Sequence, residues 1–275
     1  MEHQMHFEFS FPLRMARNAL STDCRQTVQA SYRTIRKTTA AITVLAASIV
    51  LASCGGGDDD NGPTRSGDVL ATDAQVVAHV QQSNIGFFPG INDRPAGTWR
   101  WQGEPAPRVL VHIPAPGSGY DTEQDLAQKA QRAVDLINRR LAGLLVLETV
   151  DEVPASGNHI RVRYGTSYVP PGSTNYDSYC ANVSTGPNLG QMIVPDSENG
   201  IGSNPVYVNL GNGRCNVTQD IVTHEFGHAL GLAYHFEGFG DGPPVSTAFW
   251  DVLATLYGNP VSTPATALVV VRSSD

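Results

Sequence analysis

Apolar side chains recur at helical spacing in two long segments of this chain. Between residues 121 and 141 they lie on one face, with charged residues opposite: Leu126, Ala130, Ala133, Val134, Ile137 and Leu141. This period predicts a helix long enough to back a sheet. A second apolar stripe predicts a last helix that starts at Ser246 or Thr247 and runs to Tyr257. A shorter helix is expected at residues 72–82.

Other segments carry the pattern of strands. Residues 108–113 and 160–164 alternate between apolar and polar side chains, residues 144–150 form an apolar run, and residues 206–210 resemble a further strand. Residues 165–204 are rich in Gly, Pro, Ser, Asn and Tyr, which predicts a long loop of functional or cross-linked character.

The candidate metal-binding and catalytic residues lie in one apolar segment, residues 221–235, which contains the motif H-E-x-x-H. His224 and His228 are four residues apart, so on a helix both imidazoles can point at one metal ion. Glu225 lies close enough to reach a water molecule bound to that ion, as in zinc hydrolases that use glutamate as general base. The alternative is a buried helix whose polar groups are satisfied by hydrogen bonds alone. Burying three titratable groups without a metal is costly, which favours the metal site.

The same segment resembles the metzincin clan of zinc metallopeptidases, whose pattern is H-E-x-x-H-x-x-G-x-x-H. His224, Glu225, His228 and Gly231 match that pattern in register. The expected position of the third histidine holds Tyr234, and the histidine, His235, comes one residue later. Neutral imidazole is a far commoner zinc ligand than phenol, so His235 is favoured as third ligand over Tyr234.

A second departure concerns the methionine turn that the clan places beneath the metal. The last methionine of this chain is Met192, which precedes the motif, so no residue can serve as that methionine. Phe239 or Leu253 is expected to fill the floor of the site instead.

The resemblance implies a zincin-like α+β fold in residues 98–275. Its parts would be a twisted, mostly parallel sheet with an edge strand, a backing helix, an active-site helix carrying H-E-x-x-H, and a C-terminal helix. It also implies a zinc-dependent endopeptidase acting on a protein or peptide substrate, with Glu225 as catalytic base and Zn²⁺ held by His224, His228 and His235. By the same resemblance, residues 206–210 would border the cleft and pair with an extended peptide.

Several alternatives remain open at this stage. A carboxylate could replace the third histidine, with Glu237, Asp241 and Asp251 as candidates. Tyr234 or Tyr257 could help to stabilise the oxyanion. Because the third histidine is shifted and the methionine is missing, the chain could also be a catalytically inactive zincin-like binding lipoprotein.

An export signal is predicted in residues 1–53, preceded by a long lead. A basic stretch and a short apolar run end in Leu-Ala-Ser-Cys, which resembles the bacterial lipobox and implies lipidation of Cys54. Residues 54–97 are predicted to form a flexible acidic tether followed by an N-terminal segment. Gly55 stands where an aspartate would resemble the inner-membrane retention signal, so the expected location is the cell envelope, at the outer membrane in a two-membrane bacterium. A plain secretory signal, and hence a secreted protein, is one alternative, and a short membrane anchor is another.

The formal net charge of −8 restricts the partners that are expected. An acidic chain is a poor ligand for nucleic acid, and its surface would not bind anionic lipid, so the acyl chains of Cys54 would provide the membrane contact. An exported chain with Cys54 lipidated leaves one pair of cysteines, and we expect a disulfide between Cys180 and Cys215. Residues 195–200 could bind calcium through their oxygens, but a solvated turn is the favoured interpretation.

Overall fold

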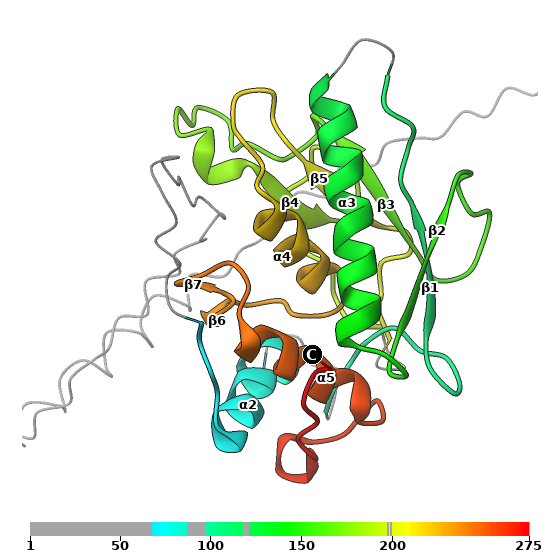
Figure 1. Ribbon diagram of the computed structural model, residues 1–275, viewed down its shortest axis with the longest axis vertical. Helices are drawn as coiled ribbons and strands as arrows, with labels where there is room; N and C mark the ends of the chain where they lie inside the picture. The colour runs from blue at the N-terminus through cyan, green and yellow to red at the C-terminus, as the bar shows by residue number, and fades with distance from the viewer. Residues whose placement is uncertain (1–67, 87–96, 118–120, 197, 199, 275) are drawn as a thin grey trace, which may run out of the picture. The chain divides into compact units, whose positions relative to one another are not determined.

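The computed structural model describes residues 68–86, 97–117, 121–196, 198 and 200–274 (Figure 1). The predicted export signal, Cys54 and most of the tether lie outside these residues. No helix within the described ranges is long and apolar enough to cross a membrane.

A five-stranded sheet forms the centre of the described region. Its order is β2-β1-β3-β5-β4, in which the first four strands are parallel and β4 runs antiparallel to β5. The strands are β1 Arg108–His112, β2 Val146–Val150, β3 His159–Tyr164, β4 Ala181–Ser184 and β5 Val206–Leu210. A short ribbon pairs β6 Phe236–Glu237 with β7 Gly240–Asp241. The α+β class with a mostly parallel sheet is therefore confirmed.

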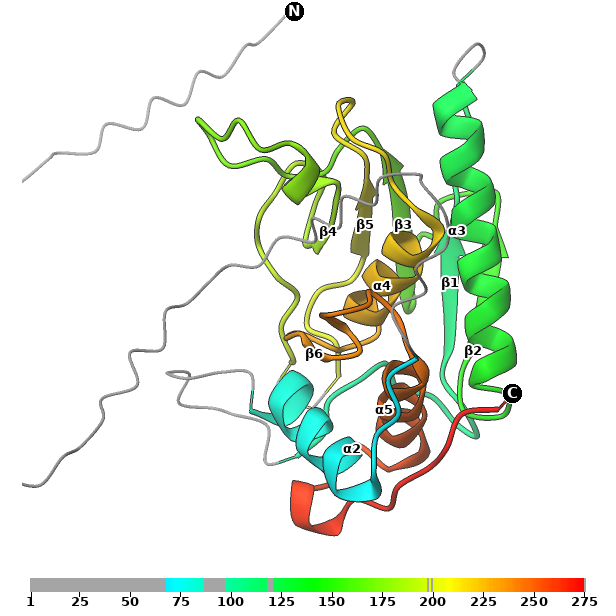
Figure 2. The same ribbon diagram turned by 60° about the vertical axis from the view of Figure 1, so that its left-hand side comes forward.

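The described residues form four α-helices. They are α2 Asp73–Val80, α3 Asp121–Arg140, α4 Gln219–Ala229 and α5 Thr247–Gly258. A π-helical turn, η1 Gln81–Ile85, continues α2, and two short 3₁₀ turns are η2 Asp177–Tyr179 and η3 Ala265–Ala267. Helices α3 and α4 lie on the same face of the sheet, while α2 and α5 lie together beyond its end (Figures 1 and 2).

The core is one cluster to which the sheet and helices α2, α3, α4 and α5 all contribute. In β1 and β3 the fully buried side chains alternate with more exposed ones. Val109 and Val111 of β1 are fully buried, as are Ile160 and Val162 of β3. They share the core with the buried stripe of α3, which includes Ile137. Burying one such aliphatic side chain stabilises the fold by about 1.5–3 kcal/mol. This layer gives the site a rigid support.

The prediction that residues 206–210 pair with an extended peptide is wrong. Strand β5 lies between β3 and β4, so both of its sides are already paired, and β4 takes the outer position. Strand β4 was hidden in the loop-rich segment because it is only four residues long and half polar. Its Asn182 receives a bond from the amide of Tyr168 and donates one to the carbonyl of Leu189, which ties the neighbouring loop to the strand.

The predicted disulfide between Cys180 and Cys215 is confirmed, with a Cα–Cα distance of 5.7 Å. It joins the start of β4 to the loop before α4. Replacing both cysteines with serine should lower the free energy of unfolding by about 4 kcal/mol, because the bridge closes a loop with a sequence separation of 35. Urea denaturation of both forms measures this difference. Equal midpoints and slopes would show that the bridge contributes nothing to stability.

Candidate metal centre

Helix α4 carries the H-E-x-x-H motif, and its two ends are defined by local sequence. The hydroxyl of Thr218 caps its start by accepting a hydrogen bond from the amide of Ile221 at 3.2 Å. At the other end Gly231 adopts φ of +107°, the left-handed region in which glycine is favoured. A Cβ at this position would also lie 3.2 Å from the carbonyl oxygen of Trp99. Gly231 therefore turns the chain sharply after the helix.

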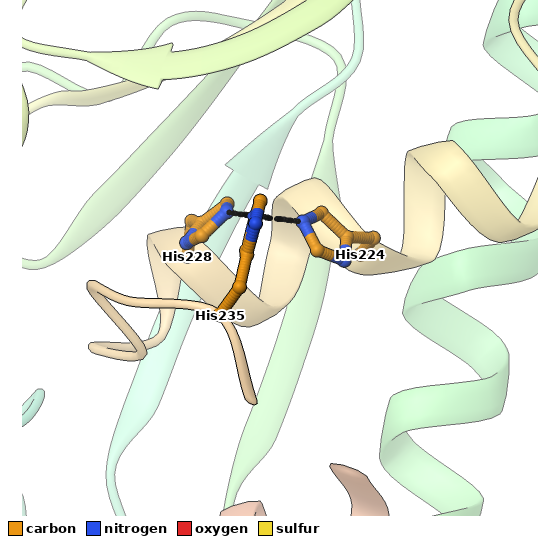
Figure 3. A group of neighbouring side chains, drawn as sticks. All are labelled: His224, His228 and His235. Carbon is orange, nitrogen blue, oxygen red and sulfur yellow. Dashed lines mark hydrogen bonds between the residues drawn. The ribbon is translucent and has the colours of Figure 1, made fainter. Parts of the chain in front are cut away.

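This turn brings three imidazoles together (Figure 3). The Nε2 atom of His224 lies 3.0 Å from that of His228 and 3.1 Å from that of His235. The Nε2 atoms of His228 and His235 are 3.3 Å apart. Among the residues that the structure describes, these form the one group of three or more His, Cys, Asp or Glu side chains close enough to share a metal ion.

Backbone carbonyls decide which ring nitrogen of each helical histidine carries the proton. Nδ1 of His224 lies 2.9 Å from the carbonyl oxygen of Pro244, and Nδ1 of His228 bonds to that of Leu232. A carbonyl oxygen only accepts, so both Nδ1 atoms must donate and, in the neutral rings, both Nε2 atoms carry lone pairs. Two lone pairs that face each other at 3.0 Å repel unless a cation lies between them.

The donor set fits a tetrahedral metal ion with nitrogen ligands. Ligand nitrogens at about 2.0–2.1 Å from a tetrahedral zinc ion are separated from one another by about 3.3–3.4 Å. The observed separations of 3.0–3.3 Å are slightly shorter. A small movement of the rings would admit the ion, and three protein ligands leave a fourth position for water or substrate.

Burial keeps the three imidazoles neutral. It lowers the pKa of His228 to about 3, and His235 lowers that pKa further. It also lowers the pKa of His224 well below its ordinary value, and there both other histidines add to the effect. Burial also lowers the pKa of His235, against the opposing effect of the charge on Asp241. Neutral imidazole is the form that binds a metal, so protons do not compete for these nitrogens near neutral pH.

Phe239 forms the floor beneath the histidines, which resolves the earlier choice between it and Leu253. Its ring stacks on that of His224 with centroids 4.1 Å apart and an interplanar angle of 26°, and it contacts the rings of His228 and His235 at 4.9 and 5.6 Å. Its other neighbour is the ring of Phe249 at 5.1 Å. An apolar floor of this kind holds the rings in place and excludes water from one side of the site.

Gly240 packs directly against the ring of His235. A Cβ at this position would lie 2.6–2.8 Å from three ring atoms, and the backbone adopts φ of +80°. Glycine is thus required here both by its conformation and by the close approach of the third histidine.

Glu225 follows His224 on α4 and is only 1% exposed. Tyr234 is 42% exposed. Tyr257 is buried, and its hydroxyl donates to the carbonyl of Leu230 at 3.0 Å. It thus fastens α5 to the end of α4, and the suggested oxyanion role of Tyr257 is not supported.

The carboxylates considered as third ligand lie elsewhere. Asp251 bonds to the guanidinium of Arg272 at 2.6 Å, while Glu237 and Asp241 are exposed and outside the histidine group. Asp196, in the segment considered for calcium, accepts bonds from the amides of Glu198 and Gly200, as in an ordinary turn.

A scan of this chain against protein-family models found no match, and a search of curated proteins found no relative. The function must therefore be argued from the site itself.

Proposed function

We propose that this protein is a zinc-dependent endopeptidase with a zincin-like fold, similar to the metzincins. The observation that carries the proposal is the convergence of three Nε2 atoms within 3.3 Å of one another, beside a buried glutamate on the same helix. The parallel sheet, the backing helix α3, the motif helix α4 and the C-terminal helix α5 match the parts that the resemblance implies.

Each residue of the site has a role in this proposal. His224, His228 and His235 would hold Zn²⁺ through Nε2, with the carbonyls of Pro244 and Leu232 orienting the two helical rings. Zinc supplies Lewis-acid activation of a water molecule and of the peptide carbonyl. Glu225 takes a proton from the attacking water and delivers it to the leaving amine.

The proposed setting is the cell envelope, with Cys54 lipidated and the acidic tether joining the anchor to the domain. It rests on the resemblance of the sequence before Cys54 to a lipobox. In that setting the substrate would be a protein or peptide outside the cytoplasm, where disulfides such as Cys180–Cys215 are stable.

Metal removal tests the proposed activity. The purified chain should cleave an unstructured protein such as casein, lose the activity in 1,10-phenanthroline, and regain it with one equivalent of Zn²⁺ after the chelator is removed. Gel electrophoresis and mass spectrometry of the fragments provide the measurement. A chain that binds zinc tightly but cleaves neither casein nor a mixed peptide library would instead be a zincin-like binding lipoprotein.

A further inference from the structure

The segment before the first strand lies against the loop that carries the third histidine. We call residues 68–86 the strap and residues 230–236 the third-histidine loop. The strap comprises α2 and η1, and α2 packs against α5. In α2 the ring of His79 stacks on the ring of Phe236, with centroids 4.5 Å apart and an interplanar angle of 17°. About 150 residues of chain separate the two segments.

Three consecutive residues of η1 bond to the third-histidine loop. The carbonyl oxygen of Ser83 accepts hydrogen bonds from the amides of Ala233, at 2.7 Å, and Tyr234, at 3.4 Å. The buried side-chain amide of Asn84 donates to the carbonyl of Gly231 at 2.8 Å. The side-chain amide of Gln82 donates to the carbonyl of His235 at 2.9 Å. The loop is therefore held at both ends and in the middle by the strap.

These contacts satisfy groups that the loop cannot satisfy by itself. Three residues separate Gly231 from His235, and the chain in this stretch is neither helix nor strand. Its amides need acceptors when they are buried, and an unmade bond there is costly. Ser83 supplies one acceptor for two successive amides, which holds Ala233 and Tyr234 in a single arrangement.

We propose that the strap is a positioning element of the metal centre, in which Gln82, Ser83 and Asn84 hold the third-histidine loop so that His235 meets the two helical histidines. This inference rests on the proposed zinc site. Gln82 is a positioning residue, since it bonds to the main chain of His235 and not to the clustered nitrogens. It is exposed, so it can be replaced without opening the core.

A matched pair of variants separates positioning from general stability. Gln82→Met keeps the size of the side chain and removes the donor. Gln81→Met makes the same change one residue earlier, at an exposed glutamine whose side-chain nitrogen lies beside Gly86. In the full chain, Gln82→Met should weaken Zn²⁺ binding by about 3–10-fold, the effect of losing one hydrogen bond. Gln81→Met should bind zinc as the unmodified chain does.

Zinc affinity is measured by competition with a chromogenic chelator, and the melting temperature of the metal-free form is recorded alongside. The visible spectrum of the Co²⁺-substituted site should change in Gln82→Met alone, because it reports ligand geometry. Equal affinities and spectra in all three proteins would overturn the role of the strap and leave the proposed function standing. If the unmodified chain binds no zinc, both proposals are wrong.

Discussion

Replacing Glu225 with glutamine should abolish peptide hydrolysis and leave zinc bound. Glutamine keeps the size of the buried side chain but cannot accept a proton from the attacking water. General acid–base catalysis by one positioned group contributes about 10²–10⁴-fold, so the rate of casein cleavage should fall by about that factor. Metal content per chain, measured by mass spectrometry of the elements, should stay at one.

The control for Glu225→Gln lies on the same helix. Asp220→Asn removes an exposed carboxylate from the first turn of α4 and should leave the hydrolysis rate within about twofold of the unmodified value. Full activity in Glu225→Gln would contradict its role as general base. Loss of zinc in that variant would show that Glu225 supports the metal site and would leave the catalytic role without support.

Replacing His235 with alanine should weaken zinc binding by at least about a hundred-fold. Partners that only orient a ligand already account for about 10–100-fold in metal affinity, and His235 supplies a ligand nitrogen itself. The variant keeps only His224 and His228, whose Nε2 atoms would hold the ion with two bonds. Chelator competition measures the affinity, and hydrolysis should be lost in parallel.

Tyr234→Ala is the matched control, because Tyr234 occupies the position at which the metzincin pattern expects a histidine. It is 42% exposed and should bind zinc normally after substitution. Retention of zinc by His235→Ala, with loss in Tyr234→Ala, would assign the third ligand to the phenol. Retention by both variants would show that neither side chain is the third ligand.

Much of the scaffold follows from periodicity in the sequence. The stripe from Leu126 to Leu141 predicted α3, and the alternation around Ile160 predicted β3, because both patterns arise from one face being buried. Strand β4 was missed because it is only four residues long and lies within a loop-rich segment, where Asn182 and Ser184 bond to neighbouring polar groups.

The histidine group was predictable because its residues lie within twelve positions and helical spacing fixes two of them. The contacts that orient these histidines were harder to predict from the sequence. The carbonyls of Pro244 and Leu232 act through the main chain and leave no trace in residue type. The contacts of Gln82, Ser83 and Asn84 with the third-histidine loop join segments far apart in the chain, and no local pattern reveals such pairing.

The central claim is that three imidazoles hold one zinc ion, and X-ray absorption at the zinc edge tests it most directly. On the purified chain loaded with one equivalent of Zn²⁺, the account predicts three imidazole nitrogens and one oxygen at about 2.0–2.1 Å. A spectrum with fewer than three imidazoles, or with sulfur ligands, would contradict it.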